Sequence, residues 1–175
     1  SNMAQWSPDG KKVYYRRNGR GVIVERDLAS GSERDVYVGE AGILSPDGQY
    51  FAIARTDLSS KAVSQLLVPV AGGQPRELLR LTQPESIGAS QWTPDSRALI
   101  ITKDHKELWL VPVKGDRPRK LDIDPEIWLK GSELNTGQRG FTLSPDGRSV
   151  AFYMGKTGSE VWALENFLPA PGAKK

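Results

Sequence analysis

The chain has 175 residues and a formal net charge of +3, with 38% hydrophobic and 26% charged residues, which is a globular composition. It contains no cysteine and one histidine, His105, which excludes disulfides and thiol catalysis and makes a histidine-based metal site unexpected. No apolar run approaches the length of a membrane span, and the basic residues are scattered among acidic ones. We therefore expect neither membrane insertion of this segment nor nucleic-acid binding.

Ser1–Asn2 at the start of the chain are interpreted as the remnant of an expression tag. A turn motif follows and occurs four times. Its copies are Ser7-Pro8-Asp9-Gly10, Ser45-Pro46-Asp47-Gly48, Thr93-Pro94-Asp95-Ser96 and Ser144-Pro145-Asp146-Gly147. Proline sets the backbone of a type I turn, Ser, Thr and Asp hydrogen-bond within it, and glycine supplies a left-handed residue. Each copy predicts a hairpin turn, and Ser96 in place of glycine predicts a more strained third turn.

Each motif follows the first strand of a unit of predicted strands with alternating hydrophobicity. Short loops rich in Gly, Asn, Asp and Ser separate the later strands. The units span residues 3–40, 41–88, 89–136 and 137–168, and the last lacks a fourth strand. Four antiparallel strands in about 40–50 residues are typical of a β-propeller blade. The sequence therefore predicts an all-β fold, one β-propeller region over residues 3–168 with about four blades, and a disordered tail at 169–175. The missing strand indicates a partial propeller, the C-terminal part of a larger ring.

The S-P-D-G turns with their following apolar strands resemble the WD-repeat-like blades of bacterial TolB-type β-propellers, from about Gln5 to Leu164. The ending 161–169 also resembles the C-terminal end of propeller regions in bacterial sensor or signalling proteins. The resemblance implies a non-catalytic scaffold that binds a protein or peptide, as the C-terminal module of a larger bacterial protein. It also favours a periplasmic or extracytoplasmic location. Two alternatives stay open. One is the substrate-gating propeller of a prolyl-oligopeptidase-like serine peptidase whose catalytic domain lies outside this chain, and the other is a carbohydrate or small-ligand propeller.

Candidate sites are few, and we expect no catalytic residue, cofactor or metal. The four motif aspartates could surround a channel and hold a cation, but each is expected to accept hydrogen bonds from its own turn. His105 lies in a polar hairpin, and no G-x-S-x-G elbow is present, so a catalytic triad is not expected. Trp128, in the long connection 125–140, is a possible contact residue.

The remaining tryptophans form two columns, that is, sets of residues at equivalent positions of the repeat. Trp6 and Trp92 lie just before the turns, and Trp109 and Trp162 lie on third strands. Aliphatic residues at the equivalent positions indicate packing between blades. In a partial ring, the third strand of the last blade and the face of the first blade around Trp6 and Tyr14 would lack a neighbour. Exposed edges and apolar faces recruit partners, so we expect self-association, the alternative being a four-blade ring closed on itself.

Overall fold

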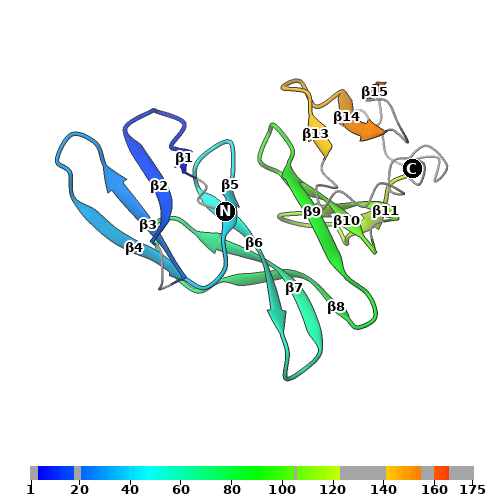
Figure 1. Cartoon of the computed structure of the whole chain (residues 1–175), viewed down its shortest axis with the longest axis horizontal. Helices are drawn as coiled ribbons and strands as arrows, with labels where there is room; N and C mark the ends of the chain where they lie inside the picture. The colour runs from blue at the N-terminus through cyan, green and yellow to red at the C-terminus, as the bar shows by residue number, and fades with distance from the viewer. Residues whose placement is uncertain (1–3, 18–20, 105, 123–140, 155–159, 166–175) are drawn as a thin grey trace. The chain divides into compact units, whose positions relative to one another are not determined.

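The computed structural model describes residues 4–17, 21–104, 106–122, 141–154 and 160–165, without the side chains beyond Ala151. In these ranges the regular elements are β-strands arranged in four antiparallel sheets (Figure 1). The chain divides into two compact units, Ser1–Gln83 and Pro84–Lys175. Three of the sheets have four strands, which confirms the predicted all-β fold of four-stranded antiparallel sheets. The described residues include no helix that could cross a lipid bilayer.

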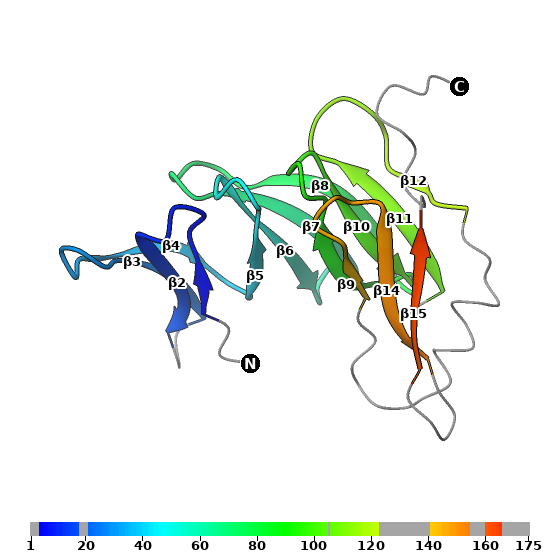
Figure 2. The same ribbon diagram turned by 90° about the horizontal axis from the view of Figure 1, so that it is seen from above.

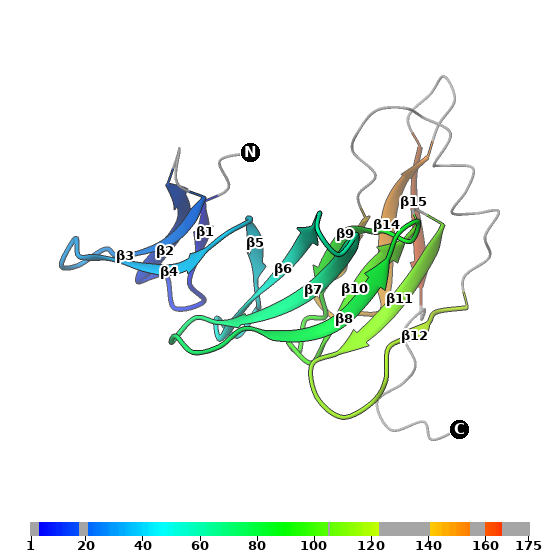
Figure 3. The ribbon, with the colours of Figure 1, turned by 90° about the horizontal axis from the view of Figure 1, so that it is seen from below.

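The first unit holds two sheets whose strands pair in chain order (Figure 3). The first sheet consists of β1 (Gln5–Trp6), β2 (Lys12–Arg17), β3 (Val22–Asp27) and β4 (Glu33–Val38). The second sheet consists of β5 (Gly42–Leu44), β6 (Tyr50–Asp57), β7 (Ala62–Pro69) and β8 (Arg76–Thr82). In both sheets the turn motif connects the first strand to the second.

The second unit holds the other two sheets. One contains β9 (Ile87–Trp92), β10 (Ala98–Lys103), β11 (Glu107–Pro112) and β12 (Arg119–Lys120). The other contains β13 (Phe141–Leu143), β14 (Ser149–Met154) and β15 (Glu160–Glu165), and Figure 2 shows β14 and β15 side by side. A core of Ile100, Leu108, Leu121, Phe141 and Val150 joins these two sheets.

The core of the first unit forms because alternate residues of each strand point to one face of their sheet. Tyr14 and Ile23 of the first sheet pack on Phe51, Ile53 and Leu66 of the second. The rings of Tyr14 and Phe51 meet edge to face, with centroids 5.3 Å apart. Such a pair adds about 0.5–1.5 kcal/mol to the free energy of burying two aromatic side chains.

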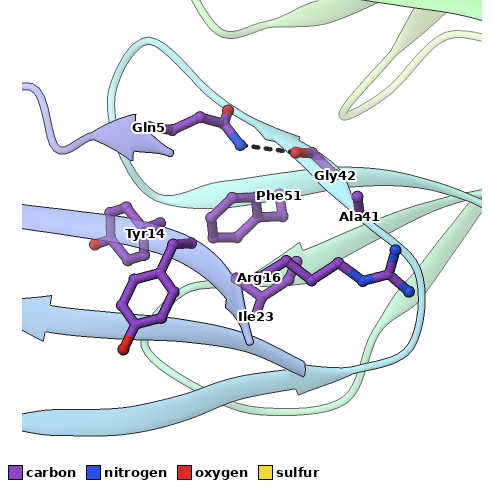
Figure 4. A pocket seen from close by; sticks show the side chains of 8 residues that line it. Gln5, Tyr14, Arg16, Ile23, Ala41, Gly42 and Phe51 are labelled. Atoms are coloured by element: carbon purple, nitrogen blue, oxygen red, sulfur yellow. Dashed lines mark hydrogen bonds between the residues drawn. The ribbon is translucent and has the colours of Figure 1, made fainter. Parts of the chain in front are cut away.

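A side-chain amide also ties the two sheets together. The Gln5 Nε2 donates to the Gly42 carbonyl over 2.8 Å (Figure 4). The Gln5 Oε1 accepts from the Leu44 amide over 2.7 Å. The first strand of one sheet is thereby fixed against the first strand of the next. Glycine is required at position 42 by the second sheet itself, because a Cβ there would lie 2.6 Å from Ile53 Cγ1 and 2.8 Å from the Ala52 carbonyl oxygen on β6.

The structure corrects the expected exposure of the first sheet. Trp6 pairs with Val13 and the neighbouring Gln5 with Tyr14, so Trp6 and Tyr14 point to opposite faces. Tyr14 is 3% exposed and lies in the core, so the prediction of an open face around Tyr14 is wrong. The Trp6–Trp92 column predicted packing between sheets, but Trp6 is 64% exposed and does not pack in this way. Trp92 in the other unit is 6% exposed.

Candidate functional site

The turn motif stabilises itself with its own side chains. Ser7 Oγ donates to Asp9 Oδ1 over 2.6 Å, and that oxygen also accepts from the Lys11 amide over 3.1 Å. The Lys12 amide donates to Ser7 Oγ over 2.9 Å, and the Gly10 amide donates to the Ser7 carbonyl over 2.9 Å. These bonds satisfy the polar groups of the turn locally.

The other three copies repeat this geometry. The hydroxyls of Ser45, Thr93 and Ser144 donate to Asp47, Asp95 and Asp146 over 2.5, 2.7 and 2.5 Å. The fourth motif position has a left-handed backbone in every copy, with φ between 59° and 72° at Gly10, Gly48, Ser96 and Gly147. Ser96 therefore adopts a conformation that costs a residue with a side chain about 1–2 kcal/mol.

Each motif aspartate is thus committed to its own turn. The Ser7 hydroxyl and the Lys11 amide hold the pKa of Asp9 below its ordinary value, so Asp9 is ionised at neutral pH. Within the described ranges, no three carboxylate, histidine or cysteine groups lie close enough together to hold a metal ion. His105 and Trp128 lie outside the described residues.

A groove of about 610 Å³ lies between the two sheets of the first unit, at the edge where the turn motifs are. This volume is within the range of about 300–1,000 Å³ found for ligand pockets. Ser7, Pro8 and Asp9 of the first turn and Asp47, Gly48 and Gln49 of the second contribute to its wall. The remaining lining residues are Lys12, Tyr14, Glu25, Arg34, Tyr50, Pro69, Val70 and Ala71.

A buried carboxylate lies at the base of this groove. Glu25 is 5% exposed, and its two oxygens accept from Arg34 over 3.0 and 2.6 Å. Lys12 Nζ donates to the same carboxylate over 2.8 Å, and the Tyr14 hydroxyl donates over 3.1 Å. We call these four residues the Glu25 cluster. A guanidinium that donates to both carboxylate oxygens, together with further donors, offsets the desolvation cost of burying a carboxylate.

The Glu25 cluster stays charged because its members support one another. Burial raises the pKa of Glu25, but the hydrogen bonds and charges of Arg34 and Lys12 outweigh burial and hold that pKa below its ordinary value. Burial, together with the Glu25 carboxylate, raises the pKa of Tyr14 to about 12. At neutral pH Glu25 is therefore ionised and Tyr14 is a neutral donor.

The cluster also spans the two sheets. Arg34 Nη2 donates to the Val70 carbonyl, which lies just beyond β7 in the second sheet, over 2.9 Å. Arg34 thereby connects the last strand of the first sheet to the second sheet while binding Glu25. One wall of the groove is fixed to the other through this guanidinium, so the shape of the groove is set in the absence of a partner.

In the second and third sheets the equivalent positions are apolar except at the arginine. The cross-strand row Tyr14, Glu25 and Arg34 corresponds to Ala52, Leu67 and Arg76, and to Ile100, Leu110 and Arg119. Each row ends in an arginine, and only the first row contains a carboxylate. The Glu25 cluster distinguishes the groove of the first unit from the general architecture of the repeat.

The architecture matches solved proteins. TolB from Acinetobacter baumannii is 19% identical with a TM-score of 0.63, and the match covers 94% of this chain and 41% of that one. A putative TolB from Agrobacterium tumefaciens is 26% identical with a TM-score of 0.63, covering 94% and 57%. The fold is that of a β-propeller. A puromycin-hydrolyzing peptidase of Mycobacterium tuberculosis is 21% identical with a TM-score of 0.65, covering 93% and 28%.

The similarity is one of structure. No family model and no curated protein matches the sequence. The chain spans 41% and 57% of the two TolB structures, so it corresponds to part of the propellers that it resembles.

The groove combines residues that the sequence motif indicates with residues that it does not. The motif supplies Ser7, Pro8, Asp9, Asp47 and Gly48, whereas the Glu25 cluster was not predicted. One signal was available in the sequence. Aligning the hairpins on their turns places the charged Glu25 where the second repeat has Leu67 and the third has Leu110.

Proposed function

We propose that this chain is a non-catalytic binding module that receives a protein or peptide segment in the groove of the first unit. The observation that carries the proposal is the groove itself, about 610 Å³ in volume, with a fixed and fully paired charged base. Preformed concave sites with a few placed polar groups are the usual form of a ligand site. The expectation that the chain has no chemistry of its own rests on the absence of cysteine, the single histidine and the missing nucleophile elbow.

The partner segment is expected to carry a basic side chain. Asp9 and Asp47 follow one another along the rim, both are exposed, and Asp9 is ionised. Lys12 and Arg34, the cations of the groove, already face Glu25. A lysine or arginine of the partner would therefore meet carboxylates at the rim, and its backbone would pass the side chains of Gln49 and Tyr50.

A peptide selection with matched variants tests the proposal. Random decapeptides are selected on the purified chain, and the enriched peptides are measured by calorimetry. Gln49→Arg places a cation at the rim and should weaken binding about tenfold or more, which corresponds to about 1.4 kcal/mol. Arg97→Glu is the control, because Arg97 follows the third turn as Gln49 follows the second. Equal affinities of both variants, or no enriched peptide, would contradict the groove as the binding site.

The substrate-gating propeller of a serine peptidase is the second candidate, and the similarity to the puromycin-hydrolyzing peptidase favours it. The two candidates differ in the rest of the natural protein, since a peptidase requires a hydrolase domain beside the propeller. For this chain alone, both predict no turnover of chromogenic ester and peptide substrates. Hydrolysis that disappears in His105→Ala would overturn the non-catalytic proposal.

A further inference from the structure

The charged side chains of the groove are not spread evenly. Asp9 and Asp47 lie at the rim, where both are exposed. Glu25 lies at the base and pairs with Lys12 and Arg34. The two cations and one anion of the base sum to one positive charge, whereas the rim carries two carboxylates. The groove therefore presents a positive base and a negative rim to a ligand that enters it.

The Glu25 carboxylate is already occupied on both oxygens. One oxygen accepts from Arg34 Nε and Lys12 Nζ, and the other accepts from Arg34 Nη2 and the Tyr14 hydroxyl. The side chain of Glu25 is 7% exposed, whereas those of Lys12 and Arg34 are 38% and 43% exposed. A ligand at the base of the groove therefore meets the two cations and not the carboxylate between them.

Both cations have donors that the Glu25 cluster does not use. Arg34 donates through Nε and Nη2 to Glu25 and the Val70 carbonyl, and its Nη1 has no acceptor among the described residues. Lys12 Nζ carries three protons and, within the same part of the chain, donates to Glu25 alone. Asp27 lies opposite Lys12 in the strand register, but its carboxylate accepts from its own turn. An acceptor in the groove can therefore bind both cations without breaking the cluster.

We propose that Lys12 and Arg34 bind a carboxylate of the partner segment, next to the basic side chain that the rim receives. This inference rests on the proposed binding function and adds a second charged group to the partner. A carboxylate carries the one negative charge that the base leaves uncompensated, and guanidinium and ammonium groups bind it through charged hydrogen bonds. A phosphate group would bring about two negative charges past the rim aspartates. The ligand class is therefore a segment with a basic and a carboxylate group close together.

Peptides that bind the groove test this inference. Selected decapeptides whose affinity falls in Gln49→Arg are synthesised again with each carboxylate neutralised in turn, by a C-terminal amide, asparagine for aspartate or glutamine for glutamate. One of these changes should weaken binding about tenfold or more in calorimetry, because a charged hydrogen-bonded pair is lost. If every neutral version binds as tightly as its parent, the carboxylate site is wrong while the groove remains a peptide site. If no peptide responds to Gln49→Arg, the proposed function and this inference both fail.

Lys12→Gln shows where the carboxylate binds. This variant removes the ammonium group but keeps Arg34, which also joins the two sheets through Val70. The affinity ratio between the acidic peptide and its neutral version should fall to about threefold or less in Lys12→Gln. Lys11→Gln is the control, because it removes the same charge from the adjacent exposed residue, which does not line the groove, and it should keep the full ratio. Circular dichroism checks that both variants are folded, and equal ratios in the two variants would overturn the inference.

Discussion

The two sheets of the first unit have equivalent faces in different environments. On the second sheet this face buries Phe51 and Ile53 completely, because the first sheet covers it. On the first sheet the corresponding Val13 and Tyr15 are half-buried. The opposite side of each first-unit sheet differs as well, since Glu25 of the first stands where the second has Leu67. Repeats with one backbone plan can thus acquire different roles by changing a few inward- or outward-pointing residues.

The largest expected effect is at the covered face. Phe51→Ala should lower the free energy of unfolding by about 3–5 kcal/mol, because it removes a fully buried ring and leaves a cavity. The corresponding Val13→Ala should cost about 1 kcal/mol or less, since Val13 is only half-buried. Urea unfolding followed by circular dichroism measures both. Similar losses at the two positions would mean that the faces do not differ as described.

The next effect concerns the Glu25 cluster. Glu25→Gln should cost about 2–3 kcal/mol at pH 7, because Lys12 and Arg34 lose their shared carboxylate. The folded-state pKa of Glu25 is lowered, so its contribution to stability is present above the ordinary value of 4.5 and is lost as the pH falls through the lowered pKa. The difference between the two proteins should therefore shrink on acidification below about pH 4.5. Glu40→Gln, at an exposed position, serves as the control and should stay within about 0.5 kcal/mol.

A smaller effect separates the first two turns. Gly10 and Gly48 have φ values of 69° and 72°, but a Cβ on Gly10 would meet no atom within 4 Å, whereas one on Gly48 would lie 2.7 Å from Pro8 Cδ. Gly10→Ala should cost about 1 kcal/mol for its backbone conformation, and Gly48→Ala about 2–3 kcal/mol because the turns also collide. Pro8→Ala should relieve the extra cost in a double-mutant cycle. No coupling between Pro8 and Gly48 would contradict the contact between the turns.

The smallest effect extends the comparison to the third turn. Ser96 has a φ of 59° where the other copies have glycine. Ser96→Gly should therefore raise the free energy of unfolding of the second unit by about 0.5–1 kcal/mol. Thermal unfolding of the two proteins in parallel provides the measurement, and a destabilised variant would show that the serine side chain stabilises the turn more than its conformation costs.

The sequence predicted contacts within a turn and missed contacts that depend on strand register or on a neighbouring sheet. The four turns were predictable because proline, the left-handed fourth residue and the Ser–Asp hydrogen bond all lie within a few residues. The Glu25 cluster was not, because Glu25 meets Arg34 only through the register of β3 and β4. Trp6 and Trp92 occupy the same slot in the repeat, yet one is 64% and the other 6% exposed. Nothing within a repeat specifies whether another sheet covers it.

The strand order has a consequence for the way the chain is synthesised. Within each described sheet, every strand pairs with its neighbours in the sequence. The hydrogen-bond ladder of the first sheet is therefore complete once Val38 has left the ribosome. Its apolar side, with Tyr14 and Ile23, stays open until Phe51 and Ile53 emerge, only about a dozen residues later. Folding during synthesis can thus proceed one sheet at a time. The apolar side of each sheet is exposed only for the short time before the next sheet packs on it.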